Sequence, residues 1–450
     1  MSVPFGPYAL TLEEFTHRLR ETFDGFSDPR RGKNTRYRLS DAGLSAFSVF
    51  FMQSPSFLEY QRGLEQSGGR SNAQTLFGVH RIPSDNHIRS LLDATEAGRL
   101  VPLFDELFEG LHRAGVVERY RSVNDTLLLA FDGTEYFCSY RVHCAHCSTR
   151  RQANGQVRYS HSALAPVVLK PGLDKVLALA PEFIQAQDGA DKQDCELNAA
   201  KRWLARWGER YAPLGVTVLG DDLYCHEPFC RELRTRDMDF LLVCKPASHA
   251  TLYEWLALLE HSQAVRTVVR RRWTGKRREI DTYRYARELP LRDGDGALTV
   301  NWCELTTTDE AGNVLYRNSW ATSLAIDHAN VAEIVEAGRG RWKIENENNN
   351  ILKTKGYHFE HNYGHGQQHL STVLASLILL AFLLHTTLEW MDDQYRLLRQ
   401  KLPSRRRLFN DIRALTGYLC FASWTQLMAF MLDSFDPNTP KRAPPGLDSG

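Results

Sequence analysis

Two short apolar segments of the chain each run directly into aspartate: TLLLAFD at residues 126–132 and VTVLGDD at residues 216–222. Continuous apolar runs of this length are typical of buried strands. In α/β sheets the carboxyl ends of the strands form the functional edge, so Asp132 and Asp221 are expected to meet there. Carboxylate oxygens suit hard divalent cations, and the pair therefore predicts a metal site. Asp222 competes with Asp221, which we prefer because it comes first after the strand and has a tyrosine three positions later.

The segments around these two strands indicate an α/β fold. Extended patterns at 163–169 and 175–184 precede a helical pattern at 191–211, and a second helix at 226–236 precedes a strand at 239–245. Strands followed by alternating helix and strand predict a mixed sheet with helices packed on it. Residues 246–318 interrupt this order with strand-like, basic segments, which predicts a mostly β insertion.

A third carboxylate is expected from RWKIENENNNILK, residues 341–353, which follows the insertion. On a helix, Glu345 and Glu347 diverge by about 200°, so only one of them can face the aspartates. Arg341 lies one turn before Glu345 and can support it as an i, i+4 pair. We therefore prefer Glu345 and expect Glu347 to point elsewhere. Lys353 lies two turns after Glu345, on nearly the same face, where it could reach a phosphate.

With these motifs the chain resembles the insertion-sequence transposases that have a ribonuclease H-like core and a DDE metal triad. Three stretches carry the resemblance: LAFDGTEYF, VLGDDLY and RWKIENENNNILKTKGYHFEHNYGHG. In the third, Arg341, Glu345 and Lys353 take the positions of an Arg-x-x-x-Glu…Lys signature, whereas Gly338 stands where that signature commonly has Tyr. The resemblance implies that Asp132, Asp221 and Glu345 hold two Mg²⁺ or Mn²⁺ ions. It also implies that the enzyme cleaves transposon ends and joins their 3′-hydroxyls to target DNA.

The fold class expected is therefore α/β, a ribonuclease H-like (retroviral-integrase-like) mixed sheet interrupted by a mostly β insertion, plus an N-terminal helical domain. The expected domains, in chain order, are a helical DNA-end-binding domain (1–120), the first part of the core (121–247), the β-rich insertion (248–318), the second part of the core with the catalytic Glu (319–395), and a C-terminal helical segment with a Pro-rich tail (396–450).

Net charge is only +1, so any nucleic-acid surface must be local rather than spread over the protein. One basic loop, DPRRGKNTRYR, contains Arg30, Arg31 and Lys33 and precedes a helix expected at 84–93, and we interpret the two together as a DNA-contacting module. The insertion carries a second basic group with aromatic residues interleaved. Its candidate DNA contacts are Arg270, Arg271, Arg272 and Lys276, with Trp273 or Trp302 available either for an unstacked base or for the core.

The segment CSYRVHCAHCSTR, residues 138–150, resembles half of a zinc site. The candidate ligands are Cys144 and Cys147 with His143 and Cys138, and His161 is an alternative fourth ligand. A hairpin loop with reduced cysteines is the other interpretation, because no second CxxC pair follows at the expected spacing.

Composition favours a cytoplasmic protein, associated with the nucleoid when bound to DNA. The N-terminus lacks a signal-peptide pattern, and nine scattered cysteines argue against a disulfide framework. The run VLASLILLAFLL at 373–384 is shorter than the about 20 residues of a membrane span, so a buried core helix and no membrane partner are expected.

The expected partner is double-stranded DNA, both the terminal inverted repeats of a transposon and target DNA, bound by a homodimer. Two alternatives stay open. One is a metal-dependent nuclease without strand transfer, and the other is a non-catalytic DNA-binding descendant of a transposase.

Overall fold

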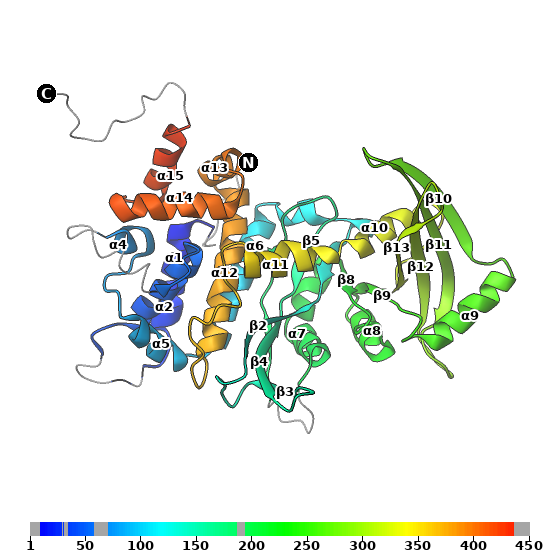
Figure 1. Ribbon diagram of the computed structural model, residues 1–450, viewed down its shortest axis with the longest axis horizontal. Coiled ribbons are helices and arrows are strands. Elements are labelled where there is room, and N and C mark those ends of the chain that lie inside the picture. Colours follow the sequence, from blue (N-terminus) through cyan, green and yellow to red (C-terminus); the bar gives the residue numbers. More distant parts are fainter. Residues whose placement is uncertain (1–9, 29, 31–34, 58–70, 187–193, 436–450) are drawn as a thin grey trace.

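A nine-stranded mixed sheet runs through the middle of the molecule, with a group of helices at one end and long twisted strands at the other (Figure 1). The computed structural model describes residues 10–28, 30, 35–57, 71–186 and 194–435. The strand order across the sheet is β10-β11-β12-β13-β9-β8-β1-β5-β6. The strands of this sheet are β1 (Leu127–Ala130), β5 (Val167–Leu169), β6 (Leu177–Ala178), β8 (Val216–Gly220), β9 (Asp239–Val243), β10 (Arg266–Trp273), β11 (Arg278–Pro290), β12 (Thr299–Asp309) and β13 (Val314–Thr322).

The core of this sheet has the predicted ribonuclease H-like arrangement. Strand β1 is central, with β8 and then β9 parallel on one side and β5 and then β6 on the other, where β5 is antiparallel to β1. Alternate residues of β1 face opposite sides, so Leu127 and Leu129 join one hydrophobic core while Leu128 and Ala130 join another. Both faces are covered, which explains why the strand is apolar throughout.

Two of the predicted strands are each divided in two by a proline. The segment 163–169 splits at Pro166 and the segment 175–184 splits at Pro181. Proline cannot donate a ladder hydrogen bond, so the chain leaves one sheet and enters another at these points. The pieces that leave the main sheet form a small antiparallel sheet with two further strands. This small sheet consists of β2 (Gly133–Ser139), β3 (Ser148–Arg151), β4 (Val157–Leu164) and β7 (Glu182–Ile184).

The insertion begins with helix α9 (Ala250–His261) and continues through β10 to β13, which confirms a mostly β segment. It does not form a separate sheet. Strand β13 pairs antiparallel with β9, Trp320 opposite Val243, so the inserted strands extend the core sheet outwards. Trp302 is buried and its indole N–H donates to the hydroxyl of Tyr253 at 3.3 Å, whereas Trp273 is 65% exposed.

Helices cover both faces of the core. The helices α7 (Glu196–Tyr211) and α8 (Glu227–Arg234) lie on one face, where the ring of Phe131 contacts Trp203 and Phe229. The opposite face is covered by α10 (Val331–Arg339), a π-helical turn η6 (Ile344–Asn349) and α11 (Asn350–Thr354).

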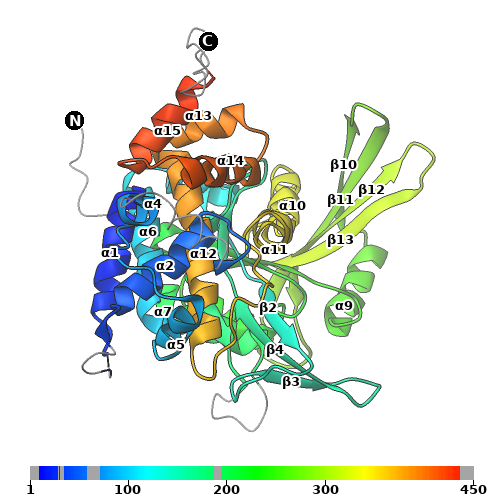
Figure 2. The same cartoon turned by 60° about the vertical axis from the view of Figure 1, so that its left-hand side comes forward.

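Helix α12 (Leu370–Met391) is the axis of the helical end of the molecule (Figure 2). It is long and apolar enough to cross a membrane, but 89% of its most apolar window is buried inside the protein, which confirms the predicted core helix. Among the described residues that precede β1, the named elements are helical, and several pack on α12. They are α1 (Leu12–Asp24), α2 (Leu39–Phe51), α4 (Asn72–Phe77), α5 (Asp85–Asp93), η2 (Ala97–Leu100), α6 (Val101–Arg113), η3 (Val117–Tyr120) and η4 (Val123–Asp125). The C-terminal helices are α13 (Asp393–Lys401), α14 (Arg405–Tyr418) and α15 (Trp424–Asp433).

Candidate active site

The two aspartates lie on adjacent parallel strands at the same edge of the sheet. Asp132 follows β1 by one residue, and Asp221 follows β8 directly. The register of β1 against β8 pairs Ala130 with Leu219. Asp132 and Asp221 each lie two residues after their member of that pair. The amide of Phe131 continues the ladder by donating to the carbonyl of Leu219 at 2.9 Å. The strand pairing therefore carries both carboxylates to one point.

Glu345 approaches from the helix on the adjoining face, paired with Arg341. Nη2 of Arg341 lies 2.6 Å from Oε1 of Glu345, and Nη1 lies 3.9 Å from Oδ1 of Asp132. The predicted i, i+4 pair is present, and the same guanidinium also faces the first aspartate. Glu345 is about half exposed, whereas the side chain of Asp132 is 21% exposed. The carboxylate that terminates the strand is thus inside the site, and the one on the helix is at its mouth.

The turn that carries Glu345 is π-helical, a rare conformation that recurs at functional sites. Its last residue, Asn349, is buried and donates from Nδ2 to Oδ2 of Asp132 at 2.9 Å. Asn348, also buried, donates in turn to Oδ1 of Asn349 at 3.0 Å. The amide nitrogen of Asn349 therefore faces Asp132, and its oxygen faces Asn348. Two of the asparagines in the Asn-rich segment thereby orient the first aspartate.

The site also contains a fourth carboxylate, Glu196, which the sequence pattern did not indicate. It lies at the start of α7, accepts from the amide of Gly133 at 2.8 Å, and accepts from the hydroxyl of Tyr224 at 2.5 Å. A Cβ on residue 133 would come within 2.4 Å of the Glu196 carboxylate, so only glycine permits this approach. The signals available in the sequence were the glycine after Asp132 and the tyrosine after Asp221.

This crowding of carboxylates changes the acidity of Asp132. Burial raises the pKa of Asp132 to about 7, and the negative charges of Glu196, Glu345 and Asp221 add to that increase, while the guanidinium of Arg341 opposes it. Burial is thus the main cause of the raised pKa, and the neighbouring carboxylates add a local concentration of negative charge. A bound cation would relieve that charge.

The structure separates the roles of Asp221 and Asp222. Oδ1 of Asp222 accepts from the amide of Lys245 at 2.7 Å and lies 3.3 Å from Nε2 of His249. Its other oxygen accepts from the hydroxyl of Ser248. Asp221 instead accepts from the amide of Leu223, within its own turn, at 2.9 Å. Asp222 therefore ties the loop after β9 to the loop after β8, whereas Asp221 belongs with Asp132.

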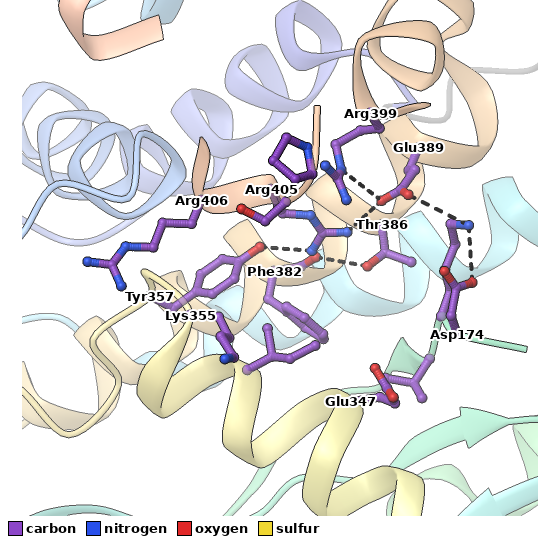
Figure 3. A pocket seen from close by; sticks show the side chains of 15 residues that line it. Asp174, Glu347, Lys355, Tyr357, Phe382, Thr386, Glu389, Arg399, Arg405 and Arg406 are labelled. Carbon is purple, nitrogen blue, oxygen red and sulfur yellow. Dashed lines mark hydrogen bonds and ion pairs between the residues drawn. The ribbon is translucent and has the colours of Figure 1, made fainter. Parts of the chain in front are cut away.

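Glu347 and Lys353 lie away from these carboxylates. Glu347 lines a different cavity of about 440 Å³, together with Asp174 and Lys355 (Figure 3). Lys353 forms an ion pair with Glu360, Nζ to Oε1 2.8 Å. Glu347 thus points elsewhere as predicted, and Lys353 is engaged by a neighbouring acid rather than by the candidate metal ligands.

The space in front of Glu345 is a cavity of about 410 Å³ between the helix and the strands β9 and β13. Arg339, Arg341, Trp342 and Asn318 also line it, and Trp342 is 48% exposed. Gly338 forms part of the wall, and a Cβ there would lie 2.8 Å from Nε1 of Trp320. The tyrosine that the related signature commonly carries would not fit at position 338 beside this tryptophan.

Comparison with known proteins agrees with this architecture. A family model described as a transposase DDE domain matches residues 177–384. Over these residues the chain is similar to transposase DDE domains. The match includes Asp221, Arg341 and Glu345, and Asp132 lies before it, on the strand that pairs with β8.

Comparison with solved structures gives matches at low similarity. A cryo-EM structure of the piggyBac transposase synaptic complex with hairpin DNA aligns with 96% of this chain and 80% of that chain, at 9% sequence identity and a TM-score of 0.37. No curated protein matches the sequence.

The basic residues predicted to contact DNA fall into two groups, one inside the matched segment and one in the N-terminal loop. Arg270, Arg271, Arg272 and Lys276 are all exposed, on β10 and the turn that follows it. Arg272 is also engaged structurally, because it pairs with the buried carboxylates of Glu279 at 2.6 Å and Asp281 at 2.8 Å.

In the N-terminal loop, Arg30 pairs with Asp28 at 2.7 Å and donates to the carbonyl of Tyr37 at 2.8 Å. Arg31 and Lys33 lie outside the described residues. The helix predicted after this loop is present as α5, with Ile88, Leu91 and Leu92 buried as expected.

The predicted zinc ligands are not all gathered together. Cys144 and Cys147 are adjacent to His161, which was the alternative ligand, and to His365, which the sequence analysis did not identify. His143 instead stacks on the ring of Tyr159, and Cys138 is exposed on β2. His365 lies in the HNYGHG stretch, 218 positions after Cys147, so only the tertiary fold brings it there.

Proposed function

We propose that the protein is a DNA transposase that cleaves the ends of an insertion sequence and joins the freed 3′-hydroxyls to target DNA. One observation carries the proposal: Asp132, Asp221 and Glu345 converge at one edge of the sheet, in a chain whose residues 177–384 match the family model of a transposase DDE domain. Asp132, Asp221 and Glu345 are the candidate catalytic residues.

The donor set fits divalent metal. The candidate ligand atoms are carboxylate oxygens, which suit Mg²⁺ or Mn²⁺. The pKa of Asp132 is raised mainly by burial and further by neighbouring carboxylates, whose negative charge such ions would neutralise. We infer two ions, which Asp132, Asp221 and Glu345 would hold together. When bound, such a pair activates the attacking oxygen and stabilises the leaving oxygen of an in-line phosphoryl transfer.

The residues around the triad would prepare it for this role. Asn349 fixes the orientation of Asp132, so its other oxygen stays directed towards the site. Arg341 lies between Asp132 and Glu345 and compensates part of their charge. We infer that Arg341 turns towards a DNA phosphate when cations take over that compensation, because a guanidinium binds phosphate and carboxylate alike.

DNA is the proposed partner, both as terminal inverted repeats and as target. The exposed basic face of β10 offers phosphate contacts, and Trp273 offers a stacking surface for an unpaired base. Trp302 is excluded from stacking because it is fully buried. Two ends must be held together for coordinated joining, so we propose a homodimer on DNA, in the cytoplasm and associated with the nucleoid.

Cleavage of a DNA duplex that carries the element's own terminal repeat tests this proposal. With Mg²⁺ or Mn²⁺, the wild-type protein should cut at the repeat boundary, and Glu345→Gln should bind the duplex without cutting it. Glu347→Gln is the matched control, because it is two positions away and lines another cavity. Cutting without joining to a target plasmid would favour a nuclease. Binding without cutting by the wild type would favour a non-catalytic descendant.

A further inference from the structure

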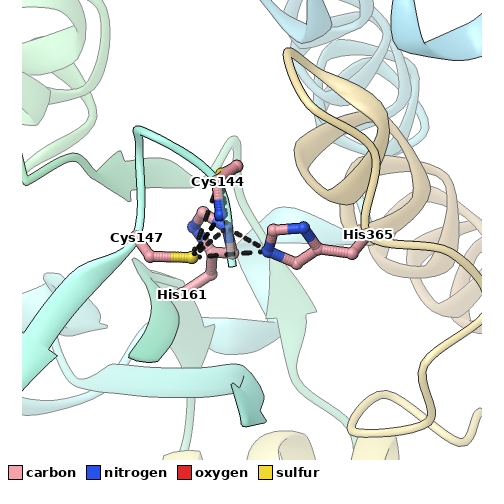
Figure 4. A group of neighbouring side chains, drawn as sticks. All are labelled: Cys144, Cys147, His161 and His365. Carbon is pink, nitrogen blue, oxygen red and sulfur yellow. Dashed lines mark hydrogen bonds between the residues drawn. The ribbon is translucent and has the colours of Figure 1, made fainter. Parts of the chain in front are cut away.

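Four metal-ligating side chains from three separate segments converge outside the carboxylate site (Figure 4). Cys144 and Cys147 lie in the loop between β2 and β3, His161 lies on β4, and His365 reaches in from the segment that precedes α12. All four ligand atoms lie within 4.8 Å of one another.

The separations between these atoms match the edges of a zinc tetrahedron. Zn–S bonds of about 2.3 Å and Zn–N bonds of about 2.0–2.1 Å give tetrahedral edges of about 3.8 Å for S–S, about 3.6 Å for S–N and about 3.3 Å for N–N. The two sulfurs are 3.9 Å apart and the two Nε2 atoms are 3.1 Å apart. Nε2 of His161 lies 3.5 Å from Sγ of Cys144 and 3.4 Å from Sγ of Cys147. Nε2 of His365 lies 3.4 Å from Sγ of Cys147.

The surrounding hydrogen bonds prepare the ligands for a cation. Nδ1 of His365 lies 2.9 Å from the carbonyl oxygen of Gly366 and must donate to it, which leaves the lone pair of Nε2 directed at the cluster. The amide of Cys144 donates to Sγ of Cys147 at 3.4 Å, an interaction that favours a thiolate.

The cluster is closed rather than open to substrate. Cys147, His161 and His365 are each more than 90% buried, and aromatic rings flank the two imidazoles. Tyr136 stacks on His161, and the ring of Phe137 lies 4.4 Å from that of His365. Four protein ligands in an enclosed position are the mark of a structural zinc site, whereas a catalytic site keeps one position for water.

We propose that Cys144, Cys147, His161 and His365 bind one structural Zn²⁺ ion that fastens the strap between the Glu345 helix and α12 to the small sheet. The strap, residues 361–369, is also anchored to the N-terminal helix α5. Arg89 donates to the carbonyl of Tyr363 at 2.6 Å, and the carboxylate of Asp93 accepts from the amides of residues 367–370.

This ion joins parts of the chain that meet at the candidate active site. The small sheet begins at Gly133, the residue after Asp132, and the strap follows the helix that carries Glu345 and Asn349. The site therefore cross-links the two halves of the core across 204 positions between His161 and His365. We therefore expect that loss of the metal loosens the strap before the main sheet unfolds.

Elemental analysis of protein purified without a histidine tag tests the site. We expect about one zinc per chain in the wild type and a retained stoichiometry in Glu345→Gln, so the result is independent of cleavage activity. His365→Ala should weaken zinc binding by roughly 100-fold or more, measured by competition with a chromophoric chelator. His143→Ala and Cys138→Ser are matched controls from the same segment and should keep the zinc.

Cobalt substitution gives a second measurement, which uses wild-type protein and so does not require any variant to fold. Co²⁺ added to metal-free wild type should give the intense visible bands of tetrahedral coordination together with thiolate-to-metal charge transfer. The proposed zinc site would be overturned if folded wild-type protein bound neither zinc nor added Co²⁺. It would also be overturned if the protein contained iron instead of zinc. Equal zinc affinity in His365→Ala and wild type would remove His365 from the ligand set.

Discussion

Asn349 donates a hydrogen bond to Asp132 across 217 positions of sequence, with Nδ2 2.9 Å from Oδ2. The helix that carries the candidate Glu is thereby bonded directly to the strand end that carries the first candidate Asp. This contact gives a function to part of the Asn-rich segment, because a buried amide is tolerated only when its polar groups have partners.

Asn349→Ala should slow cleavage roughly 10- to 100-fold, since a hydrogen bond to a charged group contributes about 1.5–3 kcal/mol. The reason is that Asp132 loses the donor that fixes its orientation. The cleavage rate at saturating Mg²⁺ and the Mg²⁺ concentration for half-maximal rate should both be measured. Asn346→Ala, an exposed asparagine on the same helix, is the control and should cleave normally. Equal rates for the two variants would contradict a positioning role.

Asp221→Asn and Asp222→Asn should have opposite profiles. Asp221→Asn removes a proposed metal ligand and should reduce cleavage by roughly 100-fold or more without lowering the melting temperature. Asp222→Asn disturbs the contacts with Lys245, Ser248 and His249, and should lower the free energy of unfolding by about 1–3 kcal/mol. Thermal melts and cleavage assays on both variants decide the assignment. A stable, inactive Asp222→Asn beside an active Asp221→Asn would reverse it.

The pKa of Asp132 makes the Mg²⁺-free protein sensitive to pH. The folded pKa is about 7 and the ordinary value is 3.8, so the two states bind the same number of protons below pH 3.8. Between these values the unfolded chain has lost its proton while the folded protein retains it, so stability falls as pH rises, by at most about 4 kcal/mol. Above about pH 7 both states have lost the proton, and the stability does not fall further.

Asp132→Asn should therefore raise the melting temperature in Mg²⁺-free buffer more at pH 8 than at pH 5. Added Mg²⁺ should stabilise the wild type at pH 8 and leave the variant unchanged. Chelators are omitted so that the proposed zinc is retained. If the melting temperatures of Asp132→Asn and wild type differed by the same amount at the two pH values, Asp132 would not titrate in this range.

Arg271→Gln and Arg272→Gln should differ although the residues are adjacent. Arg271→Gln should weaken DNA binding at all sequences and reduce the slope of log affinity against log salt by about 1. Arg272→Gln removes the cation that pairs with Glu279 and Asp281, so its main effect should be a lower melting temperature. Fluorescence anisotropy over a salt series, with melts in parallel, separates the two effects. An unchanged salt slope for Arg271→Gln would remove it from the DNA surface.

Several features were predictable from local sequence because they depend on local physics. Apolar strands that end in aspartate, an i, i+4 pair between Arg341 and Glu345, and the divergence of Glu347 follow from strand periodicity and helix geometry. The buried position of α12 was predicted from an apolar run of about twelve residues, which is short for a membrane span, although the whole helix is long and apolar enough to cross one.

Other features depend on contacts between segments that are distant in sequence, which no local pattern encodes. Glu196 reaches the site because α7 starts against Gly133, and His365 reaches the cysteines because the strap crosses the small sheet. Lys353 meets Glu360 instead of the candidate metal ligands, and Pro166 and Pro181 redirect strands into a second sheet. The sequence by itself determined which residues can carry the chemistry, through residue type and periodicity. The tertiary structure alone decided which of them meet, because proximity across hundreds of positions is set by how the whole core packs.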